Sequence, residues 1–93
     1  MKIEITDSFR SRVIDQLEFI AKDSPVRARK FQKELMSAIK NIPQRPLSYR
    51  KSIYFDNESI RDMIFKGYVI VFRINKENIQ VFGFIKYQNK LEL

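Results

Sequence analysis

The sequence predicts an α+β domain of two layers, in which a hairpin of two helices packs on a small antiparallel sheet in the order βααβββ. Three observations support this fold class. Two stretches in the first half repeat apolar residues every three or four positions, and three stretches in the second half are rich in β-branched and aromatic residues. Short polar turns separate those three stretches. The chain of 93 residues shows no linker, repeat or low-complexity segment, so residues 1–93 are assigned to a single domain.

A short alternating strand is predicted over residues 2–6, with Ile3 and Ile5 on one side. Thr6 or Asp7 can cap the helix that follows, because a side-chain oxygen there accepts from the N–H groups of the first turn. Ile14 widens the apolar stripe of this helix. The stripe itself consists of Phe9, Val13, Leu17, Ile20 and Ala21.

A second helix is predicted after a short break, with Ser24 as its N-cap and Pro25 at its first position, where the missing N–H is not needed. Pro43 ends it, and the short link makes the two helices antiparallel. Residues 43–59 follow as an extended basic loop, in which residues 53–55 form either a short strand or a loop anchor. The stripe of the second helix consists of Ala28, Phe31, Leu35, Ala38, Ile39 and Ile42.

Three strands are predicted at residues 60–65, 68–74 and 79–87, the first two joined by a tight turn at Lys66-Gly67. The second and third are apolar on both faces. In the second, Tyr68, Ile70, Phe72 and Ile74 oppose Val69 and Val71, and in the third, Ile79, Val81 and Ile85 oppose Phe82 and Phe84. One helical hairpin covers only one face. The other face is therefore either a partner-binding surface or is covered by the basic loop and the C-terminal residues.

The chain contains no cysteine and no histidine, which excludes disulfides, thiolate or imidazole metal sites, and Ser-His-Asp or Cys-His catalysis. We expect no cofactor. The N-terminal residues include no apolar targeting segment, and no stretch approaches transmembrane length, so we expect a cytoplasmic protein that does not contact a membrane.

The net charge of +7 is concentrated in one part of the chain. Between residues 24 and 51 the only acidic residue is Glu34, and the rest of the chain is balanced. This distribution indicates either a polyanionic partner, such as nucleic acid or an acidic protein segment, or a solvated helix face. The cations of this region are Arg27, Arg29, Lys30, Lys33, Lys40, Arg45, Arg50 and Lys51.

Over nearly its whole length the chain resembles the RelE/ParE superfamily of toxins. The resemblance is distributed over several short pieces that occur in the right order at the right spacing. These pieces are the helix that begins near Phe9, the link Asp23-Ser24-Pro25, the pair Ile42-Pro43, the run Ile60-Arg61-Asp62, the segment from Gly67-Tyr68-Val69 to Ile74, and the last strand from Ile79 to Lys86.

The resemblance implies the toxin of a bacterial type II toxin–antitoxin module, which a cognate antitoxin neutralises in a hetero-oligomeric complex. RelE-like members are ribosome-dependent endoribonucleases that cut mRNA, whereas ParE-like members are not nucleases and inhibit DNA gyrase. A third alternative is a non-toxic relative that binds only an antitoxin or DNA. Whether the protein is an enzyme depends on which of these holds.

A nuclease would need groups for proton transfer and phosphate stabilisation, and the candidates are Arg61, Arg73, Lys86 and Tyr87. RelE-like nucleases generally have an arginine directly after the tyrosine of the Gly-Tyr pair. Here that residue is Val69, which favours the ParE-like alternative.

The same four residues also have structural interpretations. Arg61 and Arg73 can form surface ion pairs with Asp62 or Glu77, and Lys86 and Tyr87 can be a solvated strand end with a packed ring. For binding of a partner or target, the candidates are Arg45, Arg50, Lys51, Phe82 and Phe84.

Overall fold

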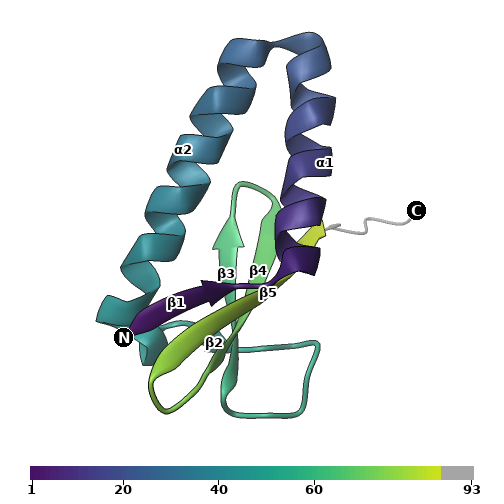
Figure 1. Ribbon diagram of the computed structural model, residues 1–93. Helices are drawn as coiled ribbons and strands as arrows, with labels where there is room; N and C mark the ends of the chain where they lie inside the picture. The colour runs from purple at the N-terminus through teal and green to yellow at the C-terminus, as the bar shows by residue number, and fades with distance from the viewer. Residues whose placement is uncertain (87–93) are drawn as a thin grey trace, which may run out of the picture.

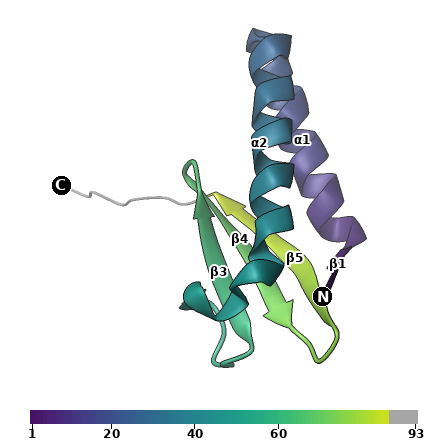
Figure 2. The same cartoon turned by 90° about the vertical axis from the view of Figure 1, so that its left-hand side faces the viewer.

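The computed structural model describes residues 1–86, which form a five-stranded sheet with two long helices over one face (Figures 1 and 2). The predicted α+β class and helical hairpin are confirmed. The elements are β1 (Lys2–Ile5), α1 (Asp7–Asp23), α2 (Pro25–Asn41), two short 3₁₀ turns (Ile42–Gln44 and Pro46–Ser48), β2 (Arg50–Lys51), β3 (Ile60–Phe65), β4 (Tyr68–Ile74) and β5 (Asn78–Lys86). No described helix has the length and apolar character that crossing a membrane requires.

Both helices begin at hydroxyl caps. The side chain of Thr6 accepts from the backbone N–H of Phe9, and that of Ser24 accepts from the N–H of Arg27. Ser24 also ends α1, because its own N–H donates to the carbonyl of Ile20. One residue therefore closes the first helix and opens the second, which keeps the hairpin link short.

The sheet has the order β1-β5-β4-β3-β2 and is mixed rather than wholly antiparallel. The predicted meander of β3, β4 and β5 is antiparallel. The first strand, however, runs parallel to β5, with Ile3 opposite Ile79 and Ile5 opposite Val81. A four-residue alternating strand does not by itself specify its neighbour or direction, since the hairpin connection and side-chain packing decide both.

The tight turn between β3 and β4 is confirmed. Lys66 and Gly67 both have positive φ, 45° and 82°. Two such residues form a type I′ turn, whose twist matches the strands on either side.

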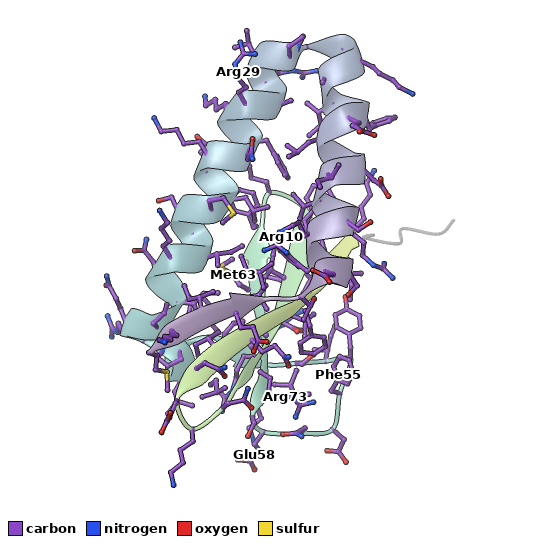
Figure 3. The ribbon with its side chains drawn as sticks, in the orientation of Figure 1. Arg10, Arg29, Phe55, Glu58, Met63 and Arg73 are labelled. Atoms are coloured by element: carbon purple, nitrogen blue, oxygen red, sulfur yellow. The ribbon has the colours of Figure 1, made fainter. Side chains whose placement is uncertain are left out.

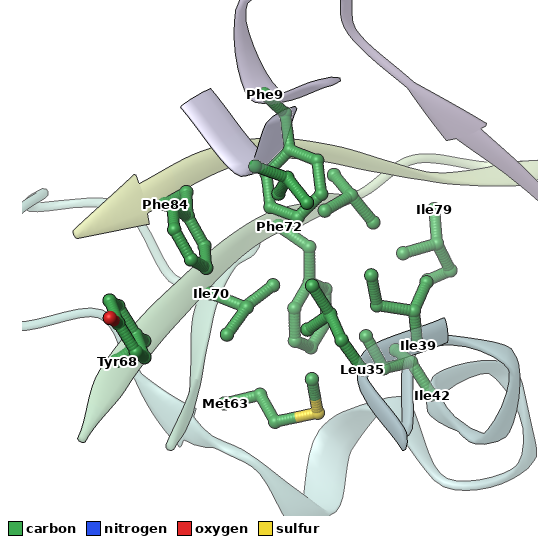
Figure 4. Close-up of a cluster of buried hydrophobic side chains, with 12 residues drawn as sticks. Phe9, Leu35, Ile39, Ile42, Met63, Tyr68, Ile70, Phe72, Ile79 and Phe84 are labelled. Carbon is green, nitrogen blue, oxygen red and sulfur yellow. The ribbon is translucent and has the colours of Figure 1, made fainter. Parts of the chain in front are cut away.

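The main core lies between the helices and the sheet (Figure 4). Leu35 and Ile39 of α2 lie in one buried cluster with Ile70 and Phe72 of β4. Edge-to-face aromatic contacts extend it, since Phe31 meets Tyr68 at 5.5 Å between ring centroids. The predicted stripes therefore face the sheet where the sheet covers the helices. Ile14, which is 47% exposed, lies outside the core cluster, and so do three stripe residues nearer the link, Ile20, Ala21 and Ala28.

A β-bulge in β5 reverses the predicted orientation of Phe84. Val71 pairs with Gly83 and Phe72 with Val81, so Phe82 has no partner on β4. The side chains after Phe82 therefore point to the face opposite to the one that simple alternation predicts. Phe84 turns into the main core and is 7% exposed, which makes the predicted placement of Phe82 and Phe84 on one face wrong.

Gly83 permits this bulge. A methyl group at Gly83 would lie 2.8 Å from Cβ of Val71, closer than real Cβ contacts come. The missing side chain lets β5 approach β4 at this point.

The second face of the sheet carries a smaller cluster of Ile60, Val69 and Val71, against which Phe82 and Ile85 pack. The loop at residues 52–59 lies at its rim, where Phe55 contacts Phe82 edge to face at 5.6 Å. The basic loop therefore covers this face only in part, since Ile64 on the same face remains more than half exposed. That the face binds a partner stays a prediction.

Candidate functional site

The helical hairpin is longer than the sheet that it covers. Figure 2 shows the linked ends of α1 and α2 standing beyond the turn between β3 and β4. Beneath this projecting part lies a groove of about 670 Å³ between the two helices and the turn. The groove is lined by Phe19, Ile20, Lys22, Asp23, Arg27, Lys30, Phe31, Glu34 and Lys66.

The groove has an apolar floor. Phe31 reaches it from α2 and is held there by edge-to-face contacts with Phe65 and Tyr68. Phe19 lies at its rim with 66% of its surface exposed. An aromatic side chain exposed to that degree beside a concave apolar surface is typical of a protein-binding site.

The rim of the groove is basic. It holds four cations and two carboxylates, and both carboxylates are paired within the site. Asp23 forms an ion pair with Arg27, and Glu34 lies 2.9 Å from Nζ of Lys66. The net positive charge therefore rests on Lys22 and Lys30. Such a rim attracts an acidic ligand.

Two groups in or beside the groove have perturbed pKa values. The hydrogen bond from Lys66, with a further contribution from the charge of Lys30, holds the pKa of Glu34 below its usual range. Burial raises the pKa of Tyr68, whose ring contacts Phe31. Glu34 therefore remains ionised at neutral pH and fastens the turn to α2.

The predicted nuclease residues are not brought together. Arg61 pairs with Phe72, and the next residue of β4 is Arg73, so the two arginines project from opposite faces of the sheet. Lys86 pairs with Tyr68, five residues along β4 from Arg73, which corresponds to about 17 Å. Tyr87 lies outside the described residues. A cluster for phosphate cleavage does not form from the three that are described.

Among residues 1–86, neither Arg61 nor Arg73 forms the ion pair with Asp62 or Glu77 that was considered above. Arg61 donates to the backbone carbonyls of Glu58 and Tyr49, at 3.0 and 3.1 Å. The carboxylate of Asp62 instead binds Arg50. For Arg73, no ion pair is found among residues 1–86.

The predicted partner-binding residues are dispersed. Arg50 is tied to Asp62, and Lys51 lies 3.6 Å from Glu58. Arg45 is exposed between the two 3₁₀ turns. The half-buried Phe82 faces the second side of the sheet. Phe84, by contrast, is not accessible to a partner, because the bulge in β5 turns its side chain into the main core.

Sequence reasoning missed the groove itself. Phe19 lies next to the predicted stripe of α1, and an aromatic residue beside a stripe on an otherwise polar helix face is a usable signal. Lys66 could be assigned only to a turn, because its approach to Glu34 depends on tertiary packing. Within residues 1–86 there is no group of three or more metal-binding side chains.

Comparison with known proteins agrees with this architecture. The model of the family described as "ParE toxin of type II toxin-antitoxin system, parDE" matches residues 3–90. A solved structure described as the chromosomal ParDE toxin–antitoxin system from P. aeruginosa is similar, with a TM-score of 0.77 and 13% sequence identity. The similarity covers 95% of this chain and 97% of that chain. No curated protein sequence gives a significant match.

The family match spans nearly all of the chain, and the fold is shared with the P. aeruginosa structure. The RelE/ParE resemblance of the sequence is thereby confirmed on its ParE-like side. The chain belongs to the family of ParE toxins of type II toxin–antitoxin systems.

Proposed function

We propose that this protein acts in the cytoplasm as a toxin that inhibits DNA gyrase and is neutralised by a cognate antitoxin bound in a hetero-oligomeric complex. The family assignment supports the toxin role. The observation that carries the choice of target is the separation of Arg61, Arg73 and Lys86 over two faces and two ends of the sheet. A ribonuclease needs such groups around one phosphate.

The position after Tyr68 supports the same choice. RelE-like nucleases generally have an arginine there, and in this chain Val69 is fully buried in the apolar cluster of the second face. A valine in this setting supplies neither charge nor hydrogen bond to a phosphate. The loss of one such preorganised group costs about 10²–10³-fold in rate in other enzymes.

The groove beneath the projecting hairpin is the proposed antitoxin site. Its apolar floor fits the apolar face of an acidic amphipathic segment, and Lys22 and Lys30 fit the acidic face. The likeness to a solved ParDE system supports an antitoxin partner for this chain as well. An unfolded antitoxin segment that folds on binding could fill a site of this shape.

Two assays test the target. We expect purified protein to inhibit supercoiling by DNA gyrase or to trap cleaved DNA, and to leave mRNA intact on programmed ribosomes. In cells, induction should stop replication and trigger the DNA-damage response. Lys86→Ala and Tyr87→Phe should reduce toxicity only modestly, because no proton transfer depends on either residue.

Cleavage of mRNA on the ribosome would give the opposite result. Codon-phased cuts in ribosome-bound mRNA that either substitution lowers by about 10²–10⁴-fold would establish a general acid or base and refute the gyrase proposal. Induction without growth arrest would contradict the toxin role and favour a relative that only binds an antitoxin or DNA.

A further inference from the structure

The loop at residues 52–59 is held in one conformation by hydrogen bonds along its length. The backbone N–H of Ser52 donates to the carbonyl of Ile60 at 2.9 Å, and the buried hydroxyl of Ser52 accepts from the N–H of Tyr54 at 3.1 Å. At its far end, the side chain of Asn57 accepts from the N–H of Ser59 at 2.8 Å. The loop is therefore an ordered part of the fold.

A buried carboxylate anchors the start of the loop. Oδ2 of Asp62 accepts from Nε of Arg50 and from the backbone N–H of Ile53, both at 3.1 Å. The other oxygen, Oδ1, is buried and has no hydrogen-bond partner among the described residues. Burying a charged group in this way is costly. The charge-assisted hydrogen bonds from Arg50 and from the N–H of Ile53 offset part of this cost, and they fix the position of Ile53.

This ordered loop displays large apolar side chains to solvent. Ile53, Tyr54 and Phe55 are 64%, 42% and 44% exposed. Phe55 is braced by its contact with the half-buried Phe82 of β5. Three consecutive large residues held exposed by a network of hydrogen bonds are typical of a preorganised binding surface, because little conformational entropy remains to be lost on binding.

The charges around the loop indicate what kind of molecule fits it. Arg73 pairs with Gln80, two residues before Phe82 on β5, so Arg73 and Phe82 lie near each other on the second face of the sheet. Phe55 contacts Phe82, and Figure 3 shows Arg73 and Phe55 in the same lower part of the molecule. Arg73 has no carboxylate partner in the described part of the chain. Lys51 is paired with Glu58, and Asp56 adds a negative charge to the loop itself.

Nucleic acid does not suit this arrangement, because phosphate binding requires several cations and the loop carries two carboxylates, Asp56 and Glu58. A single arginine beside exposed aromatic rings instead suits a carboxylate on a protein surface that also offers an apolar pocket.

We name one set of residues the loop surface: Ile53, Tyr54, Phe55, Phe82 and Arg73. We infer that the loop surface binds the protein target of the toxin, at a place where the target has an apolar pocket with a carboxylate at its edge. The inference rests on the proposed function, since it assumes a protein target. Phe82 and Arg73 lie on the face of the sheet opposite the helices, with the loop at its rim, whereas the antitoxin groove lies beneath the hairpin. Target binding and antitoxin binding are thereby assigned to separate surfaces.

The test compares Tyr54→Ser and Arg73→Gln with two controls. Leu47→Ser removes a residue that is 69% exposed outside the loop surface, and Phe19→Ser alters the groove. For each variant, thermal melting establishes folding, growth arrest on induction measures toxicity, and titration measures affinity for the antitoxin encoded beside the toxin gene. Binding to purified DNA gyrase holoenzyme is measured in parallel.

We expect Tyr54→Ser and Arg73→Gln to weaken gyrase binding by about 10–30-fold and to reduce growth arrest, with antitoxin affinity changed less than about twofold. Leu47→Ser should match the wild type in every assay. Phe19→Ser should weaken antitoxin binding alone. Folded loop-surface variants that arrest growth and bind gyrase like the wild type would overturn the inference. Loop-surface variants that keep gyrase binding and lose only affinity for duplex DNA, measured in the same way, would overturn it too.

The inference and the proposed function fail in different ways. If the wild type arrests growth without binding gyrase, and the loop-surface variants lose this arrest, the loop surface stands and gyrase is the wrong target. If the wild type neither arrests growth nor binds gyrase, both are wrong.

Discussion

Asp62 and Arg50 form an ion pair in which one partner is fully buried and the other reaches solvent. The side chain of Asp62 has no exposed surface, whereas that of Arg50 is 40% exposed. Nε and Nη2 of Arg50 each lie 3.1 Å from the same oxygen, Oδ2. The pair joins the edge strand β2 to β3 and also fixes the loop through the N–H of Ile53.

Substitution of Arg50, the exposed partner, should therefore lower the stability of the fold. Arg50→Met leaves the buried carboxylate of Asp62 without its cation, and we expect a loss of about 1–3 kcal/mol in the free energy of unfolding. Arg50→Lys keeps the charge and should cost less than about 1 kcal/mol. Urea denaturation measures both, and equal, negligible losses would show that Asp62 tolerates burial without a cation.

The buried apolar residues of α2 should contribute much of the free energy of unfolding. Leu35 is completely buried and Phe31 contacts Phe65 and Tyr68, so Leu35→Ala and Phe31→Ala should each destabilise by about 2–5 kcal/mol. Val26→Ala, at an exposed position of the same helix, should cost less than about 0.5 kcal/mol. Urea melts that show less than about 0.5 kcal/mol for both core variants would rule out this packing.

The pair of Glu34 and Lys66 should make stability depend on acid pH. The pKa of Glu34 is lowered from 4.5 in the folded state, so its contribution is fully present above that value and is lost as the pH falls through the folded pKa. Compared with Glu34→Gln, the wild type should therefore lose its advantage below about pH 4.5. The measurement is the free energy of unfolding of both proteins from pH 3 to pH 7. An advantage that grows on acidification would contradict the ion pair.

Antitoxin binding should depend only partly on charge. The groove combines the apolar Phe19 and Phe31 with Lys22 and Lys30, and salt screens the ionic part while it leaves apolar burial intact. Titration calorimetry at low and high salt should show weaker but persistent binding for the wild type. Lys30→Gln should reduce the salt dependence, whereas Phe19→Ala should lower affinity at both salt concentrations. A complete loss of wild-type binding at high salt would mean that charge alone holds the pair.

Local patterns were sufficient for most of the fold. The caps at Thr6 and Ser24, the helical stripes and the turn at Lys66-Gly67 are decided by neighbours within a few residues, and each was predictable. The direction of β1 and the bulge at Phe82 were not, since both depend on contacts between distant strands. Simple alternation therefore assigned Phe84 to the wrong face.

The candidate sites were harder to predict for the same reason. The sequence shows how many cations there are. It does not show that Arg50 and Arg61 form hydrogen bonds with other residues of the same chain, to Asp62 and Tyr49. It contains Phe19, yet the groove beside it exists only because the hairpin extends past the sheet. Surfaces of this kind arise from the relative lengths and positions of elements.

The projecting part of the hairpin also determines how backbone opening is distributed through the molecule. Amides near the link at Ser24 lie beyond the cover of the sheet, so they should exchange with solvent deuterium through local openings. Amides around Leu35 and Ile39, which are buried against the sheet, should exchange only when the whole domain unfolds. A ligand that fills the groove would bridge the two helices and slow exchange at the link. Deuterium uptake there would thus report groove occupancy without any measurement of toxicity.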